Sequence, residues 1–261
     1  MSAIATADAN FSQPSTDLQS LRVDLACALR WAARLGLHEG VDNHFSVAVP
    51  DADGVARGNR FLINPYGWHW SEITASSLVL CDSAGNVLEG ENSVETTAFC
   101  IHAPIHRLVP NATVVLHTHM PYATALTLLE DGELQMCEQN ALMFDERIAY
   151  DRDYQGLALD ESEGERMAAR IGNRSVLMLA SHGVVVTGPS VERAFNDLYY
   201  LERAAQFQVL ARSTGGRLRK ISDAVRDKVR EQMGEDGPKL AARHFGALRR
   251  MLDAQEPAYR S

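Results

Sequence analysis

The sequence predicts a single α/β domain. Strand-like and helix-like patterns intermix along most of the 261 residues, and no linker rich in Gly, Ser and Pro separates them. Neither internal repeats nor low-complexity tracts interrupt this order. The apolar fraction of 46% and the charged fraction of 23% are ordinary for a globular chain that is long enough to bury one sizeable core.

The composition argues against several classes of function. A formal net charge of -9 disfavours broad binding to nucleic acid or to an anionic membrane. No uncharged apolar run approaches the length of a membrane span, and the first residues lack the basic start and apolar core of a signal peptide. The four cysteines show no Cys-x-x-Cys spacing, so neither a zinc-thiolate site nor a disulfide framework is expected. We therefore expect a cytoplasmic protein with reduced cysteines.

The chain is expected to begin with an arm and a helix. Residues 1–14 are small and polar and are predicted to be a disordered arm. Ser15 or Thr16 could cap the helix that follows, with Asp17 favourably placed in its first turn. Apolar residues then keep a helical spacing over residues 18–32, which predicts a helix with one buried face.

Alternating apolar residues, turn residues and helical spacing predict the later elements in order. Predicted strands cover residues 45–49, 60–63, 78–82, 86–88, 114–116, 147–150, 175–180 and 184–186. Predicted helices cover residues 93–108, 121–129, 163–171, 191–211, 222–233 and 239–252. Residues 130–161 are the least regular part. We divide the chain into the arm, a folded domain over 15–233 and a charged helical tail over 234–261.

One predicted strand ends in a pair of histidines. The apolar run 114–116 leads into His117-Thr118-His119, and side chains two apart on a strand point to the same face. His182 follows the end of another apolar strand, and strand ends are where open α/β sheets place their sites. Three imidazoles with an open position suit a catalytic zinc or iron ion. The alternative is that these histidines are core or edge residues satisfied by backbone groups.

Two further groups are candidates on one predicted helix. Glu95 lies at its start and could bind a resting metal or move a proton, although by itself the residue is better explained by helix capping. His102 and His106 stand four residues apart and share a helix face. We interpret these two histidines as structural or surface residues.

An aromatic segment precedes the predicted hairpin. Trp68, His69 and Trp70, with Tyr66 nearby, could line an apolar pocket for a ligand. The alternative for each of them is ordinary core packing. The sequence contains neither a phosphate loop nor a dinucleotide-binding fingerprint.

Together these segments resemble the class II aldolase/adducin head family. The resemblance covers roughly residues 18–212, and its strength lies in the shared order and spacing of five pieces. The pieces are Asp42-Asn43-His44-Phe45-Ser46, Ile63-Asn64-Pro65-Tyr66-Gly67, Ser93-Val94-Glu95, Ala112 through His119, and Leu179-Ala180-Ser181-His182-Gly183-Val184.

The resemblance implies a fold and a set of site residues. It implies a three-layer α/β/α fold around a central, mostly antiparallel sheet, in a protein that assembles as a homotetramer. By the same resemblance, His117, His119 and His182 bind one divalent metal per chain, with zinc expected and iron(II) or manganese(II) as alternatives. Glu95 matches the family's catalytic acid/base.

The implied reaction is metal-dependent carbon–carbon lyase chemistry, either decarboxylation or aldol cleavage through a metal-stabilised enolate. The sugar-phosphate aldolases of the family have Gly and Ser where this chain has Asp42 and Val94. A carboxylate about 4 Å from a phosphate would cost about 4 kcal/mol per charge pair at intermediate dielectric. The resemblance therefore implies a small, non-phosphorylated substrate.

The substrate-binding residues are expected around the first motif and the aromatic segment. They are Asn43, His44, Trp68, His69 and Trp70, which suit a flat or aromatic carboxylic acid. Two alternatives remain open: a non-haem iron oxygenase acting on an aryl-pyruvate or mandelate-type compound, and a non-catalytic, adducin-like interaction module.

Overall fold

The computed structural model describes residues 17–261 of the chain. The predicted arm over residues 1–14 and the candidate caps Ser15 and Thr16 lie outside these residues. The first helix, α1 (Leu18–Arg34), begins two residues later than a cap at Ser15 would place it and one residue later than a cap at Thr16, because Asp17 is its N-cap and accepts a hydrogen bond from the backbone of Ser20. Asp17 thus lies before the first turn rather than inside it.

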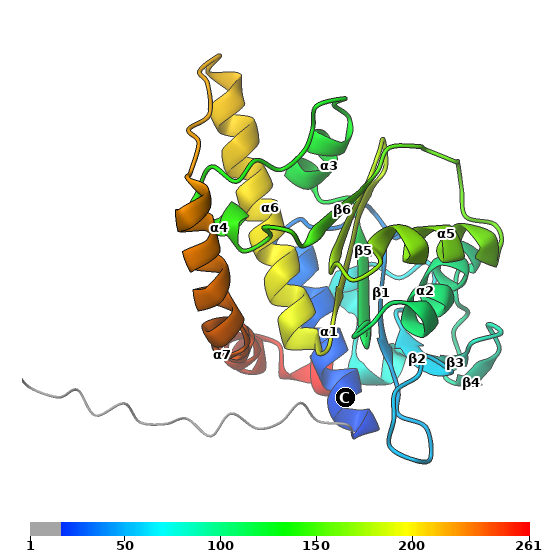
Figure 1. The fold of residues 1–261 in the computed structure, drawn as a ribbon. Helices are drawn as coiled ribbons and strands as arrows, with labels where there is room; N and C mark the ends of the chain where they lie inside the picture. Colours follow the sequence, from blue (N-terminus) through cyan, green and yellow to red (C-terminus); the bar gives the residue numbers. More distant parts are fainter. Residues whose placement is uncertain (1–16) are drawn as a thin grey trace, which may run out of the picture.

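One sheet runs through the middle of the described chain (Figure 1). Its eight strands are antiparallel except for the last pair, β6 and β7, which are parallel. The strand order across the sheet is β4 (Val87–Glu89), β3 (Val79–Asp82), β2 (Arg60–Ile63), β1 (His44–Ala48), β5 (Val114–Thr118), β8 (Gly183–Gly188), β7 (Val176–Leu179) and β6 (Ile148–Asp151). The predicted mostly antiparallel central sheet is confirmed.

Helices cover both faces of the sheet and make three layers. Figure 1 shows α1, α6 (Val191–Ser213) and α7 (Asp223–Gln255) on one side and α2 (Thr96–Leu108) and α5 (Glu161–Ile171) on the other. Alternate residues of a strand point to opposite faces of the sheet. Val114 packs into the core between the sheet and α1 and α6, whereas Val115 packs into the core between the sheet and α2 and α5. The three-layer α/β/α prediction is confirmed.

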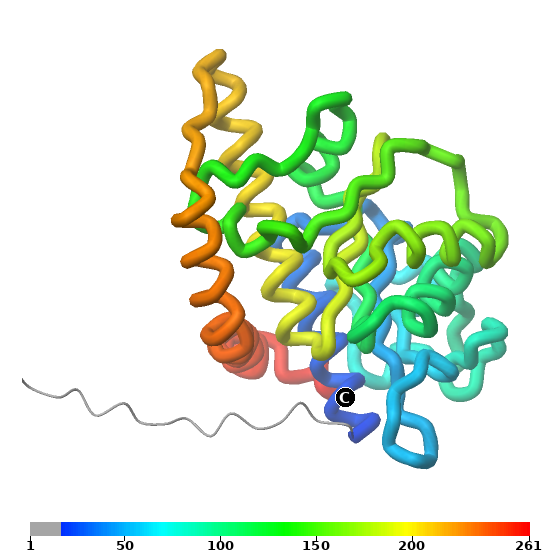
Figure 2. The backbone as a smooth tube through the Cα atoms, viewed as in Figure 1, coloured from blue at the N-terminus to red at the C-terminus, as the bar shows by residue number. Residues whose placement is uncertain are grey.

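The C-terminal region differs from its prediction. The helices expected over 222–233 and 239–252 are one continuous helix, α7, with Pro238 inside it. The predicted boundary after Met233 falls within this helix. Phe245 and Leu252 from α7, and Tyr259 from the short helix η3 (Pro257–Arg260), are buried in the same cluster as α1. Figure 2 shows the red C-terminal segment lying beside the blue α1.

Most of the other predicted elements are present within a few residues of their expected bounds. The short helix α3 (Pro121–Thr127) directly follows the His-x-His segment, as expected. The irregular stretch 130–161 contains β6 as predicted and one helical turn, α4 (Gln139–Leu142), that was not. Over residues 17–261 no helix is long and apolar enough to cross a membrane, and the four cysteines are free.

Candidate metal site

Three histidines meet at one edge of the central strands. His117 is on β5, His119 follows the end of that strand, and His182 lies in the turn between β7 and β8. Because β5 and β8 pair antiparallel, with His117 opposite Val185, the end of β5 and the start of β8 share one edge. One ligand nitrogen from each ring lies within 4.8 Å of the others. The structure thus brings together the three residues that the sequence predicts as ligands.

The turn that carries His182 has an unfavourable backbone conformation at Ser181 and a tightly packed glycine at position 183. Ser181 adopts a left-handed conformation, with φ of 55°, which costs a non-glycine residue about 1–3 kcal/mol. A Cβ atom on Gly183 would lie 2.6 Å from the carbonyl oxygen of Thr118 and 2.7 Å from Cδ2 of His119. Glycine at position 183 therefore lets the start of β8 approach the His119 ring closely enough to complete the cluster.

The donor atoms of the cluster suit a divalent cation. The Nδ1–H of His117 donates to the carbonyl oxygen of Val184 at 3.0 Å, which leaves Nε2 with its lone pair. This is the arrangement by which proteins orient a metal-ligating histidine. The Nε2 of His119 is buried and has no hydrogen-bond partner within residues 17–261. A bound cation would satisfy this atom, so the residues fit a metal.

Burial keeps these imidazoles neutral. Desolvation, with a smaller effect of the neighbouring His119, lowers the pKa of His182 to about 4. Desolvation also lowers the pKa of His117 well below its ordinary value, with His44 as the second cause. The pKa of His119 is lowered by burial and partly restored by Glu39. Neutral rings offer the lone pairs that a metal requires, so the site is ready for a cation near pH 7.

Asn43 supports the cluster from the loop before β1. Its Oδ1 accepts hydrogen bonds from the backbone N–H of Glu39 at 2.7 Å and of His119 at 3.2 Å. Its Nδ2 is buried and has no partner within the described chain. Asn64 in turn bonds to the carbonyl oxygen of Asn43 at 3.2 Å. Asn43 thus holds the backbone of His119 and keeps two donor hydrogens free, which is consistent with its predicted role in binding substrate.

His44 lies beside the cluster and leads into two further histidines. It stands directly opposite His117 in the pairing of β1 with β5, and the two ring centroids are 4.9 Å apart. Its Nδ1 lies 2.7 Å from Nε2 of His102 on α2. His102 and His106 are both buried, so of the two interpretations given to them, the structural one is correct and the surface one is wrong.

Glu95 is the N-cap residue of α2, but its side chain makes no capping hydrogen bond. Its Oε1 instead accepts a hydrogen bond from the hydroxyl of Thr97 at 2.7 Å. Within residues 17–261 no hydrogen bond or ion pair joins Glu95 to the three histidines. Its predicted part in proton transfer therefore stays a prediction.

The structure separates the members of the aromatic segment. Trp70 has no exposed surface, stacks on His38 at 5.1 Å and packs against Phe45, so its ring belongs to the core. Trp68 and His69 are exposed and remain accessible to a ligand. The Nε2 atoms of His69 and His38 lie 3.0 Å apart. Core packing, the alternative interpretation, describes Trp70.

Tyr154 is a neighbour of the site that sequence reasoning missed. Its ring centroid lies 6.2 Å from that of His182, and its side chain is exposed. It is on the loop between β6 and α5, inside the stretch that shows no periodicity, so no sequence pattern indicates it. For His102 and His106, in contrast, the spacing of four residues was a usable signal.

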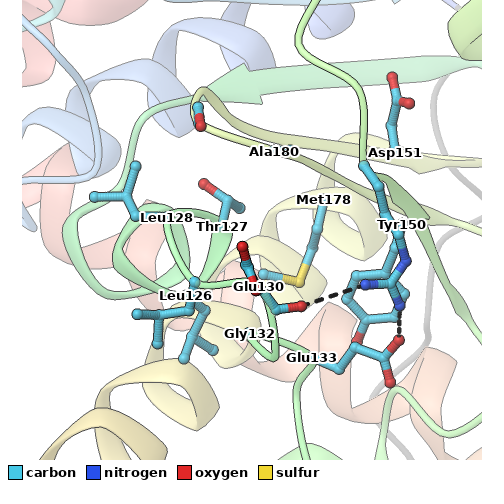
Figure 3. Close-up of a pocket in the computed structure, with 13 residues that line it drawn as sticks. Leu126, Thr127, Leu128, Glu130, Gly132, Glu133, Tyr150, Asp151, Met178 and Ala180 are labelled. Carbon is cyan, nitrogen blue, oxygen red and sulfur yellow. Dashed lines mark hydrogen bonds and ion pairs between the residues drawn. The ribbon is translucent and has the colours of Figure 1, made fainter.

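A cavity of about 360 Å³ lies beside the turn that carries His182 (Figure 3). Ala180 and Ser181 contribute to its wall. Leu126 and Met178 give it an apolar side. On the polar side, Arg152 donates hydrogen bonds to Glu133 and to the carbonyl oxygen of Glu130. Dashed lines in Figure 3 end at these two glutamates. The three clustered histidines are not among its lining residues, so this cavity adjoins the candidate metal site without containing it.

Comparison with known proteins identifies the family. The sequence profile described as Class II Aldolase and Adducin N-terminal domain matches residues 23–209, which include the five motif segments and the three clustered histidines. The chain belongs to this family. A solved aldolase II superfamily protein from Pseudomonas syringae is 37% identical, with a TM-score of 0.85 over 95% of this chain and 97% of that one. The class II aldolase fold is thereby confirmed.

Other relatives span both branches of the class II aldolase and adducin family. A Caulobacter vibrioides protein named after the class 2 aldolases is 34% identical over 240 residues, which is 91% of each chain. Human beta-adducin is 33% identical over 211 residues, which is 75% of this chain and 29% of the adducin. The family is usually associated with metal-dependent lyases, but adducins belong to it too, so membership alone does not assign an activity.

Proposed function

We propose that this class II aldolase family member is a divalent-metal-dependent carbon–carbon lyase. Its substrate would be a small, non-phosphorylated carboxylic acid, of which an aromatic one is the best candidate, and the reaction a decarboxylation or an aldol cleavage. The observation that carries the proposal is the set of three neutral histidines whose ligand nitrogens lie within 4.8 Å of one another. A family member without catalytic activity would not need to keep three such histidines together.

Zinc is the proposed ion, with iron(II) or manganese(II) as alternatives, held by His117, His119 and His182. When bound, the metal would supply Lewis acidity that stabilises negative charge on a substrate oxygen. Three protein nitrogens leave open coordination positions for that oxygen. The neutral nitrogen donors add no charge, so the site stays cationic and attracts a carboxylate.

The surrounding residues would bind the substrate and move its proton. Asn43 offers its free Nδ2 hydrogens as donors to a carboxylate or carbonyl oxygen. The exposed rings of Trp68 and His69 could hold a flat apolar group. Glu95 would return or remove the proton at carbon, a role based on its match to the family motif. Asp42, next to Asn43, disfavours a phosphate, which supports a non-phosphorylated substrate.

The decisive experiment combines elemental analysis with an activity screen. The purified protein should carry about one divalent metal per chain, and aromatic hydroxy and keto acids should be screened for release of carbon dioxide or an aldehyde. His117→Ala and His182→Ala should lose both the metal and the activity. His244→Ala, which changes a half-buried histidine on α7, is the matched control and should keep both. Full activity in the metal-free protein would refute the proposal.

Running the same screen without oxygen separates the lyase from the oxygenase alternative. A lyase keeps its activity under nitrogen, whereas an oxygenase loses it and consumes oxygen only with ferrous iron. Product formation that requires oxygen would replace the lyase assignment.

An adducin-like interaction module is the second candidate, and the adducin relatives favour it. Such a module would need neither neutral ligand nitrogens nor the orphaned Nε2 of His119. Metal-free protein after expression in zinc-supplemented medium would favour this module over the lyase.

We also propose assembly into a homotetramer. Several large apolar side chains face solvent in the single chain, and a contiguous exposed apolar patch is typical of an interaction surface. They are Leu128, Leu129, Tyr154, Leu157 and Leu159. Light scattering coupled to size exclusion should give four times the chain mass of 28.7 kDa. A monomer at micromolar concentration would refute this assembly.

A further inference from the structure

A series of hydrogen-bonded side chains runs from His44 into the interior between the sheet and α2. His44 and Ser46 are two residues apart on β1 and therefore face the same side. His102 and His106 are four residues apart on α2 and face the sheet together. All four side chains are buried. We call these four residues the histidine–serine series.

Each member of the histidine–serine series contacts the next at hydrogen-bonding distance. The His44 Nδ1 atom lies 2.7 Å from His102 Nε2, and His102 Nδ1 lies 2.5 Å from Ser46 Oγ. Ser46 Oγ lies 2.7 Å from His106 Nε2. His106 Nδ1 lies 2.6 Å from the carbonyl oxygen of Ala112, where the series ends.

The end of the series fixes the direction of every hydrogen bond in it. A carbonyl oxygen can only accept, so His106 carries its hydrogen on Nδ1. Burial keeps His106 neutral by lowering its pKa to about 4, so its Nε2 is an acceptor. Ser46 must then donate to His106 and accept from the Nδ1–H of His102. The Nε2 atom of His102 therefore accepts a hydrogen bond from the Nδ1–H of His44.

This direction leaves His44 with an unprotonated Nε2. That atom lies on the opposite edge of the ring from the His102 contact, and His44 also packs beside the ring of His117 in the cluster. In water, isolated histidine prefers to carry its hydrogen on Nε2. The series reverses this preference, because each buried donor and acceptor in it then has one hydrogen-bond partner. The one ring nitrogen of the series without a partner in it is Nε2 of His44.

We infer that Ser46, His102 and His106 are positioning residues that hold His44 as its Nδ1–H tautomer and present an unprotonated Nε2 beside the three-histidine cluster. His44 then acts as a hydrogen-bond acceptor for a hydroxyl group of the ligand, next to the donor hydrogens of Asn43. This inference deepens the proposed function and rests on it for the identity of the ligand. The tautomer itself does not depend on any lyase activity.

The test is nitrogen NMR of zinc-loaded protein labelled with ¹⁵N in its histidines. Long-range proton–nitrogen correlations distinguish a protonated ring nitrogen, an unprotonated one and one bound to metal, and His44→Gln assigns the signals. We expect His44 to show a protonated Nδ1 and an unprotonated Nε2. A protonated Nε2, or an Nε2 bound to zinc, would overturn the inference even if the lyase reaction were established.

Ser46→Ala interrupts the series without touching the cluster. We expect one zinc per chain as in the parent protein, a mixture of the two His44 tautomers, and a kcat/KM about tenfold lower. Ser77→Ala is the matched control, because Ser77 is a buried serine whose hydroxyl bonds to Thr74 instead. If Ser46→Ala left the His44 tautomer unchanged, the series would have no positioning role. If Ser46→Ala failed to fold, the spectrum of the parent protein would still show which nitrogen of His44 carries the hydrogen.

Discussion

At the scale of single residues, Gly183 sets how closely β8 approaches the histidine cluster. Gly183→Ala would place a Cβ against the His119 ring and the carbonyl oxygen of Thr118. Because the ring must move while all three ligands remain, we expect zinc affinity to fall about 10- to 100-fold, the usual effect of disturbing the support of a ligand. Competition with a fluorescent zinc chelator measures this loss.

The control for Gly183→Ala is Gly234→Ala, where an added Cβ meets nothing within 4 Å. Gly234 lies inside α7, so alanine there should leave zinc affinity unchanged and slightly stabilise the helix. Equal zinc affinity in the two variants would contradict the role assigned to Gly183.

His106 makes stability depend on pH. Its folded-state pKa of about 4 lies below the ordinary histidine value of 6.5, because burial disfavours the charged ring. The unfolded chain therefore binds more protons between these values, and the stabilisation is complete above pH 6.5 and lost as the pH falls toward 4. A shift of this size corresponds to about 3 kcal/mol of unfolding free energy.

Urea unfolding at pH 7 and at pH 4.5 tests this dependence. The parent protein should lose more unfolding free energy between the two pH values than His106→Gln, which has no imidazole to protonate at that position. Comparing the two proteins removes the contribution of other groups, such as Asp24, whose pKa is raised to about 6 by burial and which acts in the opposite direction. Parallel pH profiles would show that His106 is not the cause.

The residue-level predictions from sequence were right where one local rule decides the outcome. Alternation along a strand was enough to place His117 and His119 on one face. The orientation of Trp70 depends on its packing against His38 and Phe45, which are far away in sequence. No local pattern contains that information, so its predicted place in a ligand pocket could not be checked without the fold.

At the scale of elements, α7 shows how packing overrides local signals. Gly234 and Pro238 lie between the two helices expected over 222–233 and 239–252, and an interior proline costs a helix about 3 kcal/mol. The helix nevertheless continues, because residues beyond the proline are buried: Ala241, Phe245 and Leu252. The burial of these apolar side chains offsets the missing hydrogen bond.

Leu252→Ala tests this account of α7. Leu252 has no exposed surface, so truncation should lower the unfolding free energy by about 2–5 kcal/mol. Leu240→Ala, on the same helix at a side chain that is 44% exposed, should cost less than 1 kcal/mol because leucine and alanine have similar helix propensities. Chemical denaturation of both variants gives the comparison, and equal losses would mean that α7 is not anchored through Leu252.

At the scale of the whole molecule, the sheet and its two helical layers could be predicted, whereas the assembly of the site could not be fully predicted. Strands that alternate with amphipathic helices specify an α/β class, and the family resemblance adds the three layers and the mostly antiparallel sheet. The histidine–serine series requires β1 and α2 to face each other in one register. That register is a tertiary property, and it explains why the sequence indicated His102 and His106 only as a spaced pair.

Metal binding should stabilise the entire fold, because the three ligands come from segments that meet only in the folded chain. At a free zinc concentration 100 times the dissociation constant, the expected gain is about 2.7 kcal/mol. For a domain of this size that corresponds to a rise in Tm of roughly 5–10 °C. Calorimetry with zinc and then with a chelator measures it, and His182→Ala should show no zinc-dependent shift. A parent Tm indifferent to zinc would argue against a resident metal.

The packing of α1 against the C-terminal region has a consequence for biosynthesis. Trp31 Nε1 donates to the carbonyl oxygen of Leu248, a partner 217 residues later in the chain. At about 5–20 residues per second, a ribosome needs roughly 10–40 s to make that intervening stretch. The end of α1 that carries Trp31 thus lacks this hydrogen-bond partner until nearly all of these residues have been translated.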